Sequence, residues 1–253
     1  MNKLFDLSGK KALVTGGSRG LGRAMAQAML EFGAETAIIG SSEQVTTTAA
    51  ELSQMTGQRA VPIQADLGDR TQLQRAFDES LNQLGTLDIL IVSHGVQRRA
   101  PAEEFSLENW DFVLEVNLTS MFILNQLAGR VMLAKGKGKI INIASLLSFS
   151  GGITVPAYAA AKGGVARLTM ALSNEWARRG VNVNAIAPGY MNTEMNEALI
   201  NNPARNQQIL DRIPAARWGL PEDMKGAAVF LASAASDYVN GVIIPVDGGW
   251  MGR

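Results

Sequence analysis

The chain has no cysteine and only one histidine, His94, among its 253 residues. Without cysteine there are no disulfides, no thiolate metal sites and no thiol nucleophiles, and the composition fits a reducing compartment. One histidine excludes a multi-histidine metal centre, so we expect no bound metal. Any Ser-His-Asp triad would have to include His94.

An excess of one charge and long apolar runs are missing as well. Acidic and basic residues number 23 each, so no overall field would attract nucleic acid or an anionic membrane. The longest apolar runs, such as "LDILIV", have the length of a strand and are far too short to span a membrane. We therefore expect a soluble, cytoplasmic protein whose partners are small molecules, not nucleic acid or membrane.

Strand-like and helix-like segments alternate along the whole chain. Short apolar segments predict strands at 11–16, 35–40, 60–66, 87–93, 138–145, 181–188 and 241–249. Amphipathic segments between them predict helices, including 22–32, 69–84, 107–134, 158–179 and 221–233. Continuous apolar strands alternating with helices indicate a parallel sheet covered on both faces. We expect an α/β protein with a Rossmann-type doubly wound sheet of seven parallel strands.

No linker, repeat or low-complexity tract divides the sequence, so we expect a single domain over residues 1–253. The segment from about 190 to 218 differs from the rest because it contains no predicted strand and carries Pro203 and Pro214. We interpret it as an excursion of short helices that forms a lid over whatever the sheet binds.

A glycine-rich turn follows the first predicted strand and leads directly into a helix. Its glycines have the spacing G-x-x-x-G-x-G, which permits a tight turn, close backbone approach and a helix N-terminus aimed at a pyrophosphate. The pattern predicts dinucleotide binding, and the turn offers these residues to the cofactor: Gly16, Ser18, Arg19, Gly20, Leu21 and Gly22.

The tip of the second predicted strand bears on the choice of cofactor. A carboxylate there would hold the ribose hydroxyls of NAD and repel a 2′-phosphate. This chain has uncharged Ser41 and Ser42 instead, and Arg19 in the glycine turn could bind a phosphate. We predict a preference for NADP(H), with NAD(H) possible; the alternative is that Arg19 is only a solvated loop residue.

Tyr158 and Lys162 lie four residues apart, which places them on one face of a helix. An ammonium beside a phenol lowers the phenol's pKa and makes it a usable acid or base near neutral pH. Taken alone, the pair is equally compatible with a half-buried tyrosine and a solvated lysine.

With these features together, the chain resembles the short-chain dehydrogenase/reductase family over nearly its whole length. The matching motifs are "TGGSRGLG", "ADL" at Asp66, "VNL" at Asn117, "NIAS" ending at Ser145, "YAAAK", "APG" and "VDGG". Ser145 lies thirteen residues before Tyr158, as the family pattern requires. The resemblance implies an NAD(P)-dependent oxidoreductase that acts on CH–OH groups and assembles as a homotetramer.

The resemblance also implies roles for particular residues. Tyr158 would be the general acid/base, and Lys162 would lower its pKa and bind the nicotinamide ribose. Ser145 would orient the reacting oxygen and contact the substrate together with Tyr158. Asn117 would hold a water or a backbone carbonyl in a proton relay. Further contacts to the cofactor are implied for Asp66, Leu67, Gly95, Pro188, Gly189 and Thr193.

One motif departs from the family. After the fourth strand the family usually has Asn-Asn-Ala-Gly, whereas this chain has Val92-Ser93-His94-Gly95. The loss of both asparagines puts the local geometry in doubt. His94 takes the place of the alanine, and we interpret it as a structural histidine, the alternative being contact with the cofactor.

The substrate is indicated by two adjacent arginines, Arg98 and Arg99, just beyond the fourth strand. Two guanidiniums at the carboxyl end of a sheet can recognise a carboxylate, although they could equally form a solvated loop or a subunit contact. The stretches "QRRAP", "GYMNTEM" and "RIPAARWG" resemble the branch of the family that acts on sugar acids of the 2-dehydro-3-deoxy-gluconate or gluconate type. Part of that branch is associated with NAD, which conflicts with the predicted NADP(H) preference.

Two other functions stay open at this point. One is a ketoreductase of another substrate class, such as a 3-oxoacyl carrier-protein reductase, for which the arginines would face an acidic carrier. The other is a non-catalytic dinucleotide sensor, although such a protein would not need all four of the predicted catalytic residues.

Overall fold

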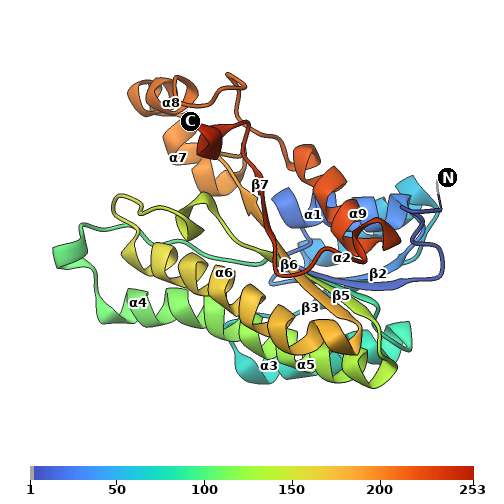
Figure 1. The fold of residues 1–253 in the computed structure, drawn as a ribbon. Helices are drawn as coiled ribbons and strands as arrows, with labels where there is room; N and C mark the ends of the chain where they lie inside the picture. The colour runs from blue at the N-terminus through green and yellow to red at the C-terminus, as the bar shows by residue number, and fades with distance from the viewer. Residues whose placement is uncertain (1–2) are drawn as a thin grey trace.

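Seven parallel strands form one sheet in the computed structural model, which describes residues 3–253 (Figure 1). In chain order the strands are β1 (Lys11–Thr15), β2 (Glu35–Gly40), β3 (Ala60–Gln64), β4 (Ile89–Val92), β5 (Gly138–Ile143), β6 (Val181–Pro188) and β7 (Ile243–Val246). Their order across the sheet is β3-β2-β1-β4-β5-β6-β7. From β1 the strands are added first towards one edge of the sheet and then, from β4, towards the other. Open α/β sheets bind ligands at this switch point between β1 and β4.

Helices cover both faces of the sheet. One face packs against α1 (Gly20–Glu31), α2 (Gln44–Thr56) and α9 (Lys225–Ala232), and the other against α3 (Arg70–Leu84), α5 (Ser120–Lys135) and α6 (Pro156–Trp176). Neighbouring strand residues point to opposite faces, so Leu13 of β1 joins one core while Ala12 and Val14 join the other. The predicted doubly wound α/β fold is confirmed. Within residues 3–253, no helix is both long and apolar enough to cross a bilayer.

Residues 190–218 form the predicted excursion of short helices. It contains α7 (Glu197–Ile200) and α8 (Pro203–Leu210), which stand away from the sheet beside the C-terminus (Figure 1). A single bridge between Met191 and Gly219 ties its two ends together. The excursion is thus anchored at its base, at the carboxyl end of β6.

The predicted helix over 107–134 is not continuous. It divides into α4 (Leu107–Leu114) and α5, and between them Glu115–Thr119 form a π-helical turn, which we call the π-turn. The backbone N–H of Ser120 donates to the carbonyl of Glu115, the wider bond that defines such a turn. Asn117 sits at the centre of this turn, and π-turns within α-helices frequently mark functional sites.

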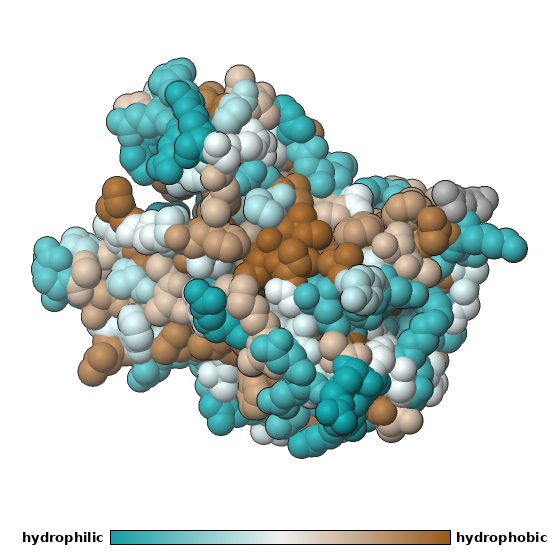
Figure 2. Space-filling view, in the orientation of Figure 1, coloured by the Kyte–Doolittle hydropathy of each residue, from teal (hydrophilic) through white to brown (hydrophobic). Residues whose placement is uncertain are grey.

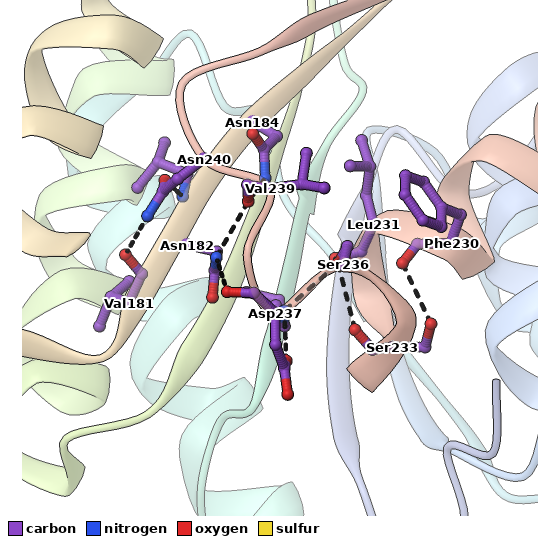
Figure 3. Close-up of polar contacts among 12 residues, drawn as sticks. Val181, Asn182, Asn184, Phe230, Leu231, Ser233, Ser236, Asp237, Val239 and Asn240 are labelled. Carbon is purple, nitrogen blue, oxygen red and sulfur yellow. Dashed lines mark hydrogen bonds and ion pairs between the residues drawn. The ribbon is translucent and has the colours of Figure 1, made fainter. Parts of the chain in front are cut away.

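The edge strand β7 is shorter than predicted, because positive φ angles at Gly241 and Gly248 bend the chain on either side of it. Asparagine side chains tie the segment before it to β6 (Figure 3). The Nδ2 of Asn184 donates to the Val239 carbonyl at 2.9 Å, and the Oδ1 of Asn240 accepts from the backbone N–H of Val183 at 2.8 Å. These amides hold the last strand against the sheet before its own ladder begins.

Candidate active site

A cleft of about 680 Å³ opens at the carboxyl ends of the strands, a size usual for small-molecule sites. It brings together residues from the turns after β1, β3 and β4, from the ends of β2, β5 and β6, and from α6. Every residue that the sequence predicted for the site, except Asn117, lines this cleft: Gly16, Ser18, Arg19, Gly20, Leu21, Gly22, Ser41, Asp66, Leu67, Gly95, Arg98, Arg99, Ser145, Tyr158, Lys162, Pro188, Gly189 and Thr193.

The turn after β1 has the geometry that a dinucleotide needs. Gly16 has a φ of 64°, and a Cβ on Gly22 would lie only 2.1 Å from the Gly16 carbonyl oxygen, so neither position accepts another residue without strain. Helix α1 begins here, and the side chain of its N-cap residue, Arg19, caps none of the first amides. The free N–H groups and the helix dipole therefore favour an anionic group in the cleft, which suits a pyrophosphate.

The tip of β2 is uncharged, as predicted, and Ser41 lines the cleft beside it. Arg19, however, pairs with a carboxylate. Its Nη1 lies 2.5 Å from the Oε2 of Glu194, at the start of the excursion, and both side chains are largely exposed. Arg19, which we predicted to bind a phosphate, therefore lines the cleft and is paired with the carboxylate of Glu194.

Tyr158 and Lys162 face each other across one turn of α6. The Nζ of Lys162 lies 5.7 Å from the centre of the Tyr158 ring and donates a 2.6 Å hydrogen bond to the Ile143 carbonyl at the end of β5. Lys162 is only 3% exposed, and burial lowers its pKa from 10.5 to about 8. A buried ammonium thus stands beside the phenol, at the floor of the cleft.

The structure does not show the expected lowering of the Tyr158 pKa. Burial raises the pKa of the phenol, and this effect outweighs a hydrogen bond with Ser145 and the positive charge of Arg99, both of which lower it. Lys162 hydrogen-bonds a backbone carbonyl and makes no hydrogen bond to the phenol oxygen in the part of the chain described here. Tyr158 is therefore protonated at neutral pH and set up to donate a proton.

Ser145 lies two residues after the end of β5. A second serine, which we did not predict, holds it in place. The Oγ of Ser148 donates to the Lys162 carbonyl at 2.6 Å and accepts from the backbone N–H of Ser145 at 3.3 Å. Ser148 therefore links the β5 end to α6. The Ser-x-x-Ser spacing, which forms a capping box here, was the available signal.

Asn117 is fully buried in the π-turn, and its side-chain amide pairs with one backbone unit. Its Nδ2 donates to the Val96 carbonyl and its Oδ1 accepts from the Val96 N–H, both at 2.8 Å. The amide thus holds the Val96 backbone, and the proton relay through Asn117 stays a prediction. The segment that it holds leads directly to the two arginines.

The arginines occupy different surroundings in the cleft. The guanidinium of Arg98 stacks 4.7 Å from the centre of the Phe112 ring, whereas Arg99 is close enough to Tyr158 for its charge to lower the phenol's pKa. Phe112 itself lines the cleft, a contribution that the sequence did not indicate. Arg99 is thus the better placed of the two to hold an anion next to the reacting oxygen.

Comparisons with known proteins show what this chain is similar to. A family model described as enoyl-(acyl carrier protein) reductase matches residues 16–251. The 2-dehydro-3-deoxy-D-gluconate 5-dehydrogenase of Pseudoalteromonas atlantica is 49% identical, with all of both chains covered.

Two solved structures extend the comparison. A candidate 2-deoxy-D-gluconate 3-dehydrogenase of Agrobacterium tumefaciens, with bound NADP, is 49% identical over all of both chains with a TM-score of 0.93. A gluconate 5-dehydrogenase of Burkholderia cenocepacia, in complex with NADP and tartrate, is 40% identical over 99% of this chain and 98% of its own, with a TM-score of 0.95. The chain belongs to the short-chain dehydrogenase/reductase family of NAD(P)-dependent oxidoreductases.

Proposed function

We propose that this protein interconverts a secondary alcohol and a ketone on a sugar acid of the 2-dehydro-3-deoxy-gluconate or gluconate type, using NADP(H). The observation that carries the proposal is that Arg99, Tyr158 and Ser145 share one cleft with the dinucleotide turn. A carboxylate held by a guanidinium would place another carbon of the same short molecule against the phenol. The relatives named for sugar acids and the NADP in two related structures support the substrate class and the cofactor.

The chain's own groups account for the proton side of this reaction. NADPH, when bound, supplies the hydride. The phenol of Tyr158 donates a proton to the carbonyl oxygen, or accepts it back from the alcohol. The hydroxyl of Ser145 orients that oxygen, and the charge of Lys162 stabilises the phenolate left behind. Asn117 holds the Val96 backbone and, through it, the segment that presents Arg99.

We further propose that the excursion at 190–218 closes over the bound molecules as a lid. Met191 and the residues from Thr193 to Asn196 line the cleft, and the base of the excursion is tied at Gly219. Thr193 would then contact the cofactor, together with the other predicted residues of the β6 end.

We propose a cytoplasmic homotetramer. Its subunits would pack through the faces of α5 and α6 and through the edge strand β7. Figure 2 shows hydrophobic residues gathered on the surface around β7. Val242, beside β7, is 37% exposed, and Phe122 of α5 is 43% exposed. Sedimentation velocity measures the mass of the assembly directly.

The test follows NADPH and NADH absorbance against a panel of keto-sugar acids, their neutral keto-sugar counterparts and a 3-oxoacyl thioester. We expect turnover with carboxylated sugars and NADPH. Arg99→Ala should raise the KM for these substrates about tenfold or more, because a charge-assisted bond is lost, while Arg98→Ala should change it less.

Two results would contradict the proposal. Equal turnover of neutral and carboxylated sugars, with no effect of either arginine, would remove the carboxylate contact. Efficient reduction of the thioester alone would favour a carrier-protein reductase, the activity closest in wording to the matching family model.

A further inference from the structure

His94 joins the end of β1 to the start of α5. Its Nδ1 lies 2.8 Å from the Oγ1 of Thr15, and its Nε2 lies 2.7 Å from the Oγ of Ser120. Thr15 ends β1 directly before the dinucleotide turn, and Ser120 begins α5 directly after the π-turn. Both hydroxyl residues are completely buried. One side chain therefore connects the cofactor turn to the segment that carries Asn117.

The hydrogen bonds around the ring determine where its proton lies. The hydroxyl of Ser120 donates to the Val116 carbonyl at 2.6 Å, so its oxygen is left to accept a proton from Nε2 of His94. The Oγ1 of Thr15 accepts from the Ser93 N–H at 3.1 Å and can donate its own proton to Nδ1. All bonds are satisfied together by a neutral imidazole with its proton on Nε2.

The surroundings keep the ring neutral. Burial lowers the pKa of His94 from 6.5 to about 3, and the nearby charge of Lys162 acts in the same direction. The tautomer set by the two hydroxyls therefore persists throughout the neutral range.

The backbone around His94 has no room to move independently. A Cβ on Gly16 would lie 2.8 Å from the His94 Cα, and a Cβ on Gly95 would lie 3.0 Å from the Oδ1 of Asn117. Asn117 also holds Val96 through both of its amide groups. Residues 94–96 are thus clamped between the dinucleotide turn and the π-turn, and a shift of one is passed to the other.

We propose that His94 is a positioning residue, which sets the spacing between the dinucleotide turn and the Asn117 segment through its two hydrogen bonds. An alanine, the usual residue of the family at this place, could make neither bond. The inference rests on the proposed function only in taking NADP(H) as the ligand of the cleft, and it holds for any carbonyl substrate.

The first test uses the fact that the chain contains one histidine. The imidazole nitrogens of ¹⁵N-labelled protein give unambiguous NMR signals. We expect a neutral ring protonated on Nε2, with no titration between about pH 5 and 8, in contrast to the ordinary histidine pKa. A ring that titrates near its ordinary pKa, or carries its proton on Nδ1, would overturn the proposal.

The second test measures the dissociation constant of NADPH by fluorescence in three variants. His94→Ala removes both bonds and should weaken binding about fivefold or more. His94→Asn can still accept from Thr15, and His94→Gln can still reach Ser120, so each should recover part of the loss. Where a substrate is turned over, kcat should follow the same order.

Thr169→Val is the matched control, because Thr169 is buried in a hydrogen-bond network with Asn142 and does not line the cleft. It should lower the melting temperature without changing NADPH binding. If His94→Ala behaves like this control, the histidine is merely structural and the proposal is wrong. If no sugar acid is turned over, the proposed function is refuted. The NADPH-binding and NMR measurements still test whether His94 is a positioning residue.

Discussion

At the scale of single residues, the most consequential group is the buried ammonium of Lys162. Its pKa of about 8 in the folded chain lies below its value of 10.5 in the unfolded chain, because burial disfavours the charge. Between these two values the unfolded chain binds more protons, so this group makes the folded state more stable as the pH rises. Below about pH 8 the buried charge of Lys162 destabilises the folded state by on the order of 3 kcal/mol.

Lys162→Met, which keeps an apolar stem and removes the charge, should therefore raise the melting temperature at pH 7 while it abolishes turnover. This gain in melting temperature should shrink towards pH 10.5, where Lys162 of the folded wild type has also lost its proton. Thermal unfolding at both pH values measures this, with the exposed Lys137→Met as control. If Lys162→Met and the wild type differ in melting temperature by the same amount at both pH values, the lysine does not carry a destabilising buried charge.

Helix spacing and the resemblance to the family made the candidate catalytic residues predictable, but neither could predict their electrostatics. Tyr158 and Lys162 stood out because a helix places residues four apart on one face. Their roles, and that of Ser145, came from the resemblance. The raised pKa of Tyr158 depends on how deeply α6 packs against β5, which spacing does not reveal. The Ser-x-x-Ser spacing signals a capping box at Ser148, but it does not reveal the bond from Ser148 to the Lys162 carbonyl on another element.

At the scale of elements, the dinucleotide turn and the proposed lid meet through Arg19 and Glu194, which are 175 residues apart in the sequence. The pair is largely exposed, so it contributes less than about 1 kcal/mol to stability. A bound 2′-phosphate would offer Arg19 a stronger partner, since it carries more negative charge. Cofactor choice and lid position would then be coupled through one arginine.

Arg19→Ala should raise the KM for NADPH about tenfold and leave that for NADH nearly unchanged, because only NADPH carries the phosphate. Glu194→Gln should lower the KM for NADPH by freeing the arginine. Initial rates with both cofactors measure the two effects. Parallel changes for NADPH and NADH, or a strong NADH preference of the wild type, would show that Arg19 does not bind the phosphate.

The elements themselves were predicted well except where tertiary contacts alter them. Helical periodicity over 107–134 correctly identified a buried face, but it could not show the π-turn at Glu115–Thr119. A single wider turn leaves the apolar pattern nearly intact, and its side-chain contacts are long-range: Asn117 binds Val96 of the loop after β4. Similarly, the Arg19 contact with Glu194 depends on where the excursion folds back.

At the scale of the whole molecule, the strand order explains how distant motifs become one site. β1, β4, β5 and β6 are sequence segments separated by helices, yet they end at the same edge of the sheet. The alternation of strands and helices was sufficient to predict this arrangement, because parallel strands with right-handed crossovers allow few other topologies. The proposed tetramer has no such local signal, because it would depend on surfaces that a single chain leaves uncovered.

The central claim is that the phenol of Tyr158 carries the proton while NADPH delivers the hydride. The most direct measurement compares Tyr158→Phe with the wild type for NADPH binding and for turnover of a keto-sugar acid. We expect the NADPH dissociation constant to stay within about twofold and turnover to fall about a thousandfold, because the proton donor is lost and the ring is kept. A variant that binds NADPH normally and retains more than about a tenth of wild-type turnover would contradict the account.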